Sequence, residues 1–224
     1  MTTQPTKAVL FDMDGVLVDS YDAHLESWLV MANEQGQSFT KEHFDTVFGR
    51  TSFEIIAELW ENCDLSREEM MEMDDRKELL FREILEKNFP AMPGIKKLVA
   101  ALDEAGFQLA VGSSGPPENV EFVLNALGLK DRFDAVVTGR DVTRGKPDPE
   151  VFLTAAAKVG VDPSRCIVVE DAPPGIKAAH AGGMQAIGLA STGRTPEMLA
   201  EAEMVVTSLE SLTPDSFDRL IEKS

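Results

Sequence analysis

Two aspartates, Asp12 and Asp14, follow the apolar segment Ala8–Phe11 near the start of the chain. Residues two apart in extended backbone point to the same side, so both carboxylates can face one ligand. Gly15 then lets the backbone turn sharply and a substrate come close. An EF-hand loop is a poor fit, because its glycine stands at position six and Gly15 comes too early. The acids therefore either cap a turn or form part of a metal-assisted phosphoryl-transfer site.

Polar residues also follow three later apolar segments. Ser113 and Ser114 come after Leu109–Val111, and their hydroxyls can donate hydrogen bonds to phosphate oxygens. Lys146 follows the next segment, just before a predicted helix, and the acid pair Glu170 and Asp171 ends another. Ligands of parallel α/β sheets bind beyond the carboxyl ends of the strands, where all these groups are expected to meet. The set predicts a site for an anion held with a divalent cation.

Short apolar segments separated by helical ones predict the sheet that positions these groups. The expected strands are Ala8–Phe11, Leu109–Val111, Ala135–Val137, Cys166–Val169 and Ala186–Leu189. A glycine follows several of the helical segments, where a left-handed residue often ends a helix: Gly106, Gly128, Gly160 and Gly182. Asp148-Pro149-Glu150 predicts a helix start, with Asp148 as its cap. The alternation predicts an α/β fold with a parallel sheet covered on both faces.

The stretch from residue 19 to 90 has no convincing strand. Thr51 and Ser66 each begin a capping-box pattern, and a long helix is expected to run from Ser66 into the high eighties. We therefore predict a core domain of residues 1–18 and 91–224, interrupted after its first strand by a helical domain of residues 19–90.

Composition narrows the class of partner. The chain has 224 residues and a net charge of -18, which disfavours nucleic acid and anionic membrane surfaces. It has no apolar run long enough to span a membrane and no signal-peptide core, so a cytoplasmic location is expected. The two cysteines, Cys63 and Cys166, are expected to be reduced core thiols. The expected partner is a small phosphorylated metabolite, and the expected state is a monomer or weak dimer.

Four motifs in this sequence resemble those of the haloacid-dehalogenase-like superfamily, in its β-phosphoglucomutase-like branch. They read FDMDGVLVDS, VGSSG, GKPDPEVF and VVEDAPPGIKAAHAGGM, in the order that the family has them. The resemblance implies a Rossmann-like parallel-sheet core with an inserted helical cap, Mg²⁺ as cofactor, and an aspartyl-phosphate intermediate.

The resemblance also implies a role for each acid. Asp12 matches the nucleophile and a metal ligand. Asp14 matches the general acid/base, and its backbone carbonyl matches a metal ligand. Glu170 and Asp171 match the metal-binding acids.

Other core positions receive roles in the same way. Ser113 matches the phosphate-binding hydroxyl, and Lys146 matches the cation that spans the nucleophile and the phosphate. Gly15 and Ser114 are expected to lie against the substrate. The family often has a cis peptide at the position of Lys146–Pro147.

The helical cap is expected to select the substrate and, by closing, to exclude water. The candidate residues are His24, Trp28, Gly49, Arg50 and Lys77. His24 matches a position typical of the branch, and Lys77 resembles a cap lysine that reaches into its site.

Two departures from the sugar phosphomutase favour a phosphatase. Ser52 stands where the mutase has an arginine, and Pro116-Pro117 replaces a lysine and a phosphate-contacting asparagine. A mutase must hold a second phosphate, so the sequence favours hydrolysis of a small phosphomonoester, such as a sugar or polyol phosphate. A β-phosphoglucomutase-type mutase is the alternative within the family. A non-catalytic phosphometabolite-binding or regulatory protein is the alternative from another class.

Overall fold

The computed structural model describes residues 6–48, 50–60 and 64–222. By its internal contacts the chain separates into two compact units, Met1–Asp19 with Ala91–Ser224, and Ser20–Pro90. The first unit contains the sheet, and the second is helical. Gly49 and Cys63, both named above, lie outside the described residues.

Six parallel strands form the sheet of the first unit, in the order β3-β2-β1-β4-β5-β6. Strand β1 (Ala8–Phe11) lies between β2 (Gln108–Gly112) and β4 (Cys166–Glu170). The other strands are β3 (Ala135–Val137), β5 (Gln185–Leu189) and β6 (Met204–Val206). The predicted α/β parallel sheet is confirmed. Strand β6 was not predicted: its three residues are apolar, but they are only half-buried and follow the charged residues Glu201 and Glu203.

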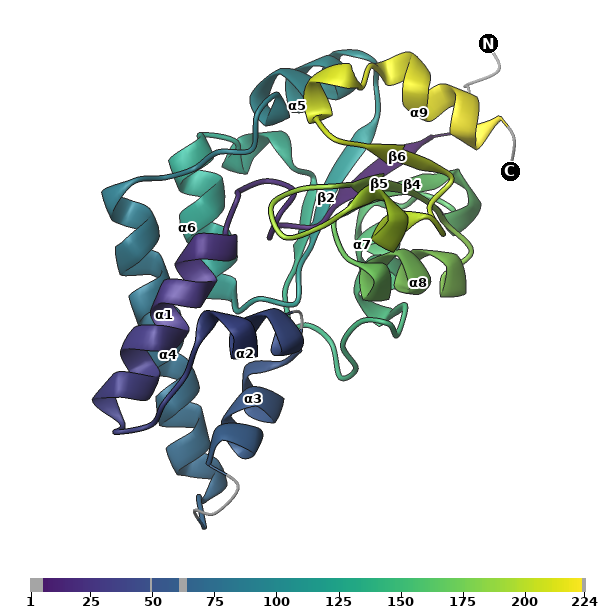
Figure 1. Cartoon of the computed structure of the whole chain (residues 1–224). Helices are drawn as coiled ribbons and strands as arrows, with labels where there is room; N and C mark the ends of the chain where they lie inside the picture. The colour runs from purple at the N-terminus through teal and green to yellow at the C-terminus, as the bar shows by residue number, and fades with distance from the viewer. Residues whose placement is uncertain (1–5, 49, 61–63, 223–224) are drawn as a thin grey trace. The chain divides into compact units, whose positions relative to one another are not determined.

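Helices cover both faces of this sheet (Figure 1). On one face lie α7 (Glu150–Val159) and α8 (Pro173–Ala181), and on the other lie α5 (Ile95–Glu104) and α9 (Pro214–Ile221). Helix α6 (Pro117–Leu127) connects β2 to the turn before β3. The two faces of β1 explain its unbroken apolar sequence: Leu10 packs into a cluster with Phe152, while Phe11 contacts Phe133.

Four helices make up the described part of the second unit: α1 (Tyr21–Glu34), α2 (Lys41–Val47), α3 (Ser52–Leu59) and α4 (Arg67–Lys87). The capping boxes predicted at Thr51 and Ser66 are both present, and no strand occurs among the described residues of this unit. Its core is built from large apolar side chains on all four helices, among them Trp28, Phe44 and Ile56.

Two local expectations need correction. Helix α8 is followed by Gly182 with φ of -84°, and the left-handed residue is the next one, Gly183, at φ of +74°. Helix α7 begins at Glu150, so Pro149 precedes the helix, although the Asp148 carboxylate does accept a hydrogen bond from the Glu150 N–H.

Cys166 is buried and unpaired, as predicted. Burial, together with the charge of Asp162, raises the pKa of its thiol to about 12. Across the described residues, none of the helices combines the length and apolar character needed to cross a membrane.

Candidate active site

The register of the sheet places Asp12 between two polar segments. Phe11 pairs with Val111 of β2 and with Val169 of β4. Asp12, one residue further along, therefore lies beside Gly112 on one side and Glu170 on the other, and its N–H donates to the Val169 carbonyl at 3.0 Å. The predicted convergence at the carboxyl ends of the strands is present for these residues.

A tight turn follows Asp12. The Met13 carbonyl accepts from the Leu17 N–H at 2.8 Å, and the Gly15 N–H donates to the Val18 carbonyl at 2.8 Å. Gly15 has φ of +71°, and a Cβ built on it would overlap the Asp171 carboxylate. Glycine is therefore required here both for the backbone conformation and for the space that Asp171 occupies.

Lys146 joins two strand ends that are distant in sequence. Its Nζ lies 2.6 Å from Asp12 Oδ1 and 2.8 Å from Glu170 Oε1, and 9% of its side chain is exposed. The peptide bond to Pro147 is cis, as the family resemblance led us to expect. Lys146 thus lies where it can offset the charge of a nucleophilic carboxylate and of a phosphate bound to it.

The two carboxylates that contact this lysine lie close to a third, that of Asp171. Oxygens of Asp12, Glu170 and Asp171 all lie within 4.8 Å of one another, and all three residues are buried. Oxygen donors in such a group are the ligands that Mg²⁺ prefers, so the residues present fit this cation. Burial raises the pKa of Asp12 to about 7, with Glu170 and Asp14 adding to the shift and Lys146 opposing it.

The pKa of Asp171 is also raised well above its ordinary value. Burial is the largest cause, and the charges of Glu170 and Asp12 add to it. For Lys146 burial lowers the pKa, but attraction to Asp12 and Glu170 outweighs it, and the pKa rises. The pKa values of Asp12, Asp171 and Lys146 therefore all rise, and the surplus of buried carboxylates over the cations beside them contributes to each rise. A divalent cation would remove the imbalance.

Two contacts of Asp171 were missed by the sequence analysis. Ser191 Oγ donates to Asp171 Oδ2 at 3.3 Å, and Arg194 Nε lies 3.6 Å from the same oxygen. Both residues follow β5, and they belong to none of the four motifs. Their position after the end of a predicted strand was the available signal.

Asp14 and Ser113 lie close to the same edge. The charge of Asp14 contributes to the raised pKa of both Asp12 and Asp171, which places its carboxylate in their vicinity. Ser113 is buried, and its hydroxyl accepts from the Gly115 N–H at 3.0 Å. Ser114 is exposed, beside this loop.

In the helical unit, His24 and Lys77 meet although 53 positions separate them. Lys77 Nζ lies 2.9 Å from His24 Nδ1 and 2.9 Å from Glu78 Oε1, and the lysine is buried. A lysine ammonium only donates, so His24 Nδ1 accepts and carries no proton in this arrangement. Arg50 is separate from this pair: it is exposed and forms an ion pair with Glu58 at 2.6 Å.

Comparison with known proteins identifies the family of this chain. Residues 6–183 match the family model described as haloacid dehalogenase-like hydrolase. The chain therefore belongs to the haloacid dehalogenase-like hydrolases, and it is an enzyme of the β-phosphoglucomutase-like group.

Particular relatives have two kinds of activity in their names. The chain is 32% identical to β-phosphoglucomutase of Bacillus subtilis, covering 92% of each chain. It is 33% identical to validoxylamine A 7'-phosphate phosphatase of Streptomyces hygroscopicus subsp. limoneus, covering 91% of this chain and 94% of that one. The solved β-phosphoglucomutase of Clostridium difficile superposes with a TM-score of 0.86 at 27% identity, over 97% of this chain and 98% of that one.

Proposed function

We propose that this protein is a Mg²⁺-dependent phosphatase that hydrolyses a small phosphomonoester, a sugar or polyol phosphate, through an aspartyl-phosphate on Asp12. The observation that carries the proposal is the bridge from Lys146 Nζ to Asp12 and Glu170 within a buried group of acids. Such an arrangement supports nucleophilic attack by a carboxylate on an anionic group, which like-charge repulsion would otherwise oppose.

In the first step Asp12 attacks phosphorus through a carboxylate oxygen, and the bond from phosphorus to the substrate oxygen breaks. Lys146 stabilises the negative charge on the transferring group, and Ser113 donates a hydrogen bond to one of its oxygens. Asp12, Glu170 and Asp171 would hold Mg²⁺ together with the Asp14 carbonyl, and the bound cation would supply further positive charge. Asp14 gives its proton to the leaving alcohol.

In the second step a water molecule attacks the phosphorus of the aspartyl-phosphate. Asp14, now ionised, takes a proton from this water, and the bond from phosphorus to the Asp12 oxygen breaks. Inorganic phosphate leaves, and both aspartates return to their starting protonation states. One group therefore serves as acid and then as base, which typically contributes about 10²- to 10⁴-fold to each step.

We further propose that residues of the helical unit choose the substrate. The supporting observation is that Lys77 is held in place by His24 and Glu78, so its ammonium has a defined position despite a long side chain. Arg50 is exposed and Gly49, next to it, is proposed with it as a second contact for the substrate. Gly15 and Ser114 are proposed to contact the substrate from the sheet unit.

The mutase remains the second candidate, because relatives include a β-phosphoglucomutase. Two features favour hydrolysis. Pro116, which precedes α6, and Pro117, which begins it, have no side-chain cation or amide for a second phosphate. Ser52 begins α3 where the mutase has its arginine.

A screen of phosphorylated metabolites with phosphate release as readout tests the proposal. We expect release from sugar or polyol phosphates with Mg²⁺ and none with EDTA. Supplying β-glucose 1-phosphate and following glucose 6-phosphate separates the two activities. Turnover that persists in EDTA would contradict the metal-dependent mechanism, and isomerisation faster than phosphate release would favour the mutase.

We also propose that the enzyme acts in the cytoplasm. We propose that it is a monomer or weak dimer, and size-exclusion chromatography would check this oligomeric state.

A further inference from the structure

One carboxylate joins the two ends of the segment that contains Lys146 by hydrogen bonds. We call residues 143–150 the lysine loop. Glu150, at its end, accepts hydrogen bonds through Oε1 from the Thr143 N–H at 3.0 Å and through Oε2 from the Arg144 N–H at 2.9 Å. The Thr143 hydroxyl also donates to both oxygens, at 3.2 and 2.9 Å. The first residue of α7 thus holds the beginning of the loop.

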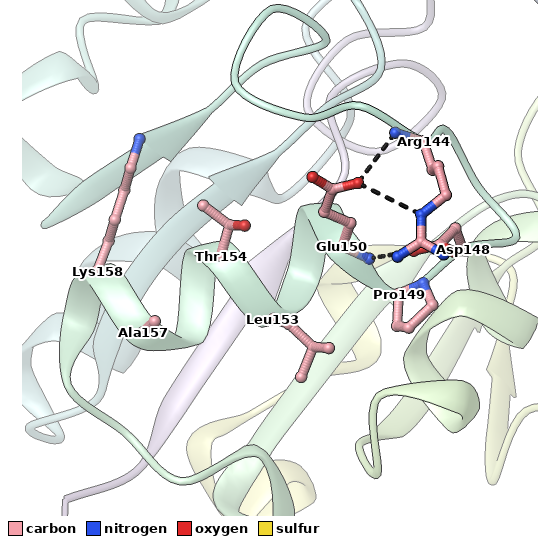
Figure 2. A pocket seen from close by; sticks show the side chains of 8 residues that line it. All are labelled: Arg144, Asp148, Pro149, Glu150, Leu153, Thr154, Ala157 and Lys158. Carbon is pink, nitrogen blue, oxygen red and sulfur yellow. Dashed lines mark hydrogen bonds and ion pairs between the residues drawn. The ribbon is translucent and has the colours of Figure 1, made fainter.

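A second set of contacts ties the same two ends together. The Asp148 N–H donates to the Gly145 carbonyl at 3.0 Å, and Asp148 Oδ1 accepts from the Glu150 N–H at 3.0 Å. Arg144 Nη1 lies 3.1 Å from Asp148 Oδ2. Figure 2 shows Arg144, Asp148 and Glu150 meeting at the start of α7. Only Lys146 and Pro147 remain between Gly145 and Asp148, which this hydrogen bond joins.

The beginning of the loop is exposed, whereas the Lys146 ammonium lies 4.8 Å from the centre of the Phe152 ring. Thr143, Arg144 and Gly145 are exposed, and a Cβ built on Gly145 would meet no atom within 4 Å. Lys146 must nevertheless bring its ammonium to 2.6 Å from Asp12 and 2.8 Å from Glu170. A lysine side chain has four rotatable bonds, so its end is well placed only if its backbone is fixed.

Glu150 is suited to this task as an anion. Hydrogen bonds from Thr143 lower the pKa of its carboxyl, and those from Arg144 add to the effect, so it is ionised near neutral pH. Hydrogen bonds from N–H groups to a carboxylate are roughly twice as strong as those between neutral groups. The carboxylate also lies in the first turn of α7, where the helix dipole favours negative charge.

We propose that Glu150 is a positioning residue: by clamping the lysine loop closed, it holds the Lys146 ammonium between Asp12 and Glu170. The consequence for turnover rests on the proposed function of Lys146, whereas the consequence for the placement of Lys146 does not. Glu150 acts on the rate only through Lys146 and contacts no substrate.

The test compares Glu150→Gln and Glu150→Ala with matched changes at Glu69. Glu69 is a control of the same chemistry, because its carboxylate accepts from the Ser66 N–H at 2.8 Å and the Ser66 hydroxyl at 2.7 Å, in the first turn of α4. With p-nitrophenyl phosphate we expect kcat to fall about 10-fold for Glu150→Gln and about 100-fold for Glu150→Ala, with KM changed less than about threefold. The Glu69 variants should keep the wild-type kcat.

A second measurement follows Lys146 directly. Acetic anhydride labelling with mass spectrometry should find Lys146 protected in the wild type, because its ammonium is buried and paired. Glu150→Gln and Glu150→Ala should increase the labelling rate of Lys146 several-fold, and the Glu69 variants should not. If circular dichroism shows that Glu150→Ala is unfolded, the test uses Glu150→Gln and Thr143→Val instead. Thr143→Val replaces only the hydroxyl of Thr143 with a methyl group.

The outcomes separate the two proposals. If Lys146 stays as protected as in the wild type in the folded Glu150 variants and in Thr143→Val, the clamp is overturned. If labelling increases but kcat is unchanged, Glu150 does position Lys146, and the inferred effect of that position on turnover is overturned. If Lys146→Met retains full phosphatase activity, the proposed function fails, while the labelling result still decides whether Glu150 positions Lys146.

Discussion

Each unit of this chain contains a buried lysine, and the two lysines have different partners. In the sheet unit, Lys146 lies between the carboxylates of Asp12 and Glu170. In the helical unit, Lys77 bonds to one carboxylate, Glu78, and one imidazole, His24. Its ammonium also lies 5.6 Å from the centre of the Trp28 ring. The distances of the four hydrogen bonds are similar, so the two sites differ in charge rather than in geometry.

The difference indicates which lysine belongs to a reacting centre. Around Lys146 a third acid, Asp171, adds to the negative charge, and burial raises the pKa of Asp12 and Asp171. Such a group is stable only with a further cation or a proton. The hydrogen-bonded partners of Lys77 carry a single negative charge that matches its own. A charge imbalance among buried groups is typical of reacting centres, and fewer carboxylates are hydrogen-bonded to the Lys77 ammonium than to the Lys146 ammonium.

The largest effect on turnover is expected from a change in the sheet unit, at Asp12. Asp12→Asn removes the nucleophile while keeping the shape of the side chain, so turnover should fall by about 10⁴-fold or more. Circular dichroism should show an intact fold, and Asp131→Asn, on an exposed turn, should keep normal activity. Steady-state kinetics with p-nitrophenyl phosphate provides the measurement. Near-normal rates for Asp12→Asn would remove this residue from the nucleophile's role.

A smaller loss is expected when the cation beside Asp12 is removed. Lys146→Met keeps the stem of the side chain but leaves the transferring charge without its ammonium, so kcat should fall by about 10²- to 10³-fold. The same change in the helical unit, Lys77→Met, should act mainly on KM, because we place that lysine in substrate selection. Initial rates over a range of substrate concentrations distinguish the two effects. An equal loss of kcat in both variants would show that the two lysines have the same role.

Stability sharpens the comparison further. Removing one partner of a buried ion pair leaves the other charge uncompensated, so Lys77→Met should lower the free energy of unfolding by about 3 kcal/mol. The double variant Lys77→Met with Glu78→Gln should recover much of this loss. Added Mg²⁺ should stabilise Lys146→Met, because the carboxylates beside residue 146 can bind the cation. The loss of unfolding free energy that Lys77→Met shows relative to the wild type should be the same with and without Mg²⁺. Urea unfolding with and without Mg²⁺ checks both statements, and equal stabilisation of the two deficits would contradict them.

The smallest effect is a dependence of stability on pH in the absence of metal. Burial raises the pKa of Asp12 from 3.8 to about 7, so between these values the folded protein binds a proton that the unfolded chain releases. Asp12 therefore lowers the free energy of unfolding as pH rises through this window. Asp12→Asn cannot titrate, so in EDTA its Tm relative to the wild type should increase from about pH 5 to about pH 8. A difference that stays constant or shrinks would contradict the raised pKa.

The sequence was a good guide where function depends on the order of strands and loops. Asp12, Lys146, Glu170 and Asp171 could be placed together because each follows an apolar segment and parallel strands end at a common edge. The capping boxes at Thr51 and Ser66 could be predicted for a similar reason, since their hydrogen bonds join residues only three positions apart.

Contacts between side chains distant in sequence could not be predicted. Arg194 and Ser191 approach Asp171 because the chain turns back toward the edge of the sheet after β5. The residue types in this segment do not predict such a turn. His24 meets Lys77 because α1 packs along α4, in a pairing that depends on how the two helices are rotated. The clamp by Glu150 is local, but the sequence indicates only a helix start there. Strand β6, like β3, has only three residues, but it follows two nearby glutamates and was not recognised.

The central position of β1 in the sheet has a consequence for folding during synthesis. Val9 is synthesised well before its partners in the sheet, Leu109 and Ile167. The apolar residues of β1 therefore stay unpaired until their partner strands have been synthesised. The helical unit can fold earlier, because its contacts are nearer in sequence. We expect the sheet to form only once residues through β4 have emerged, so chains released earlier should be a ready target for chaperones and proteases.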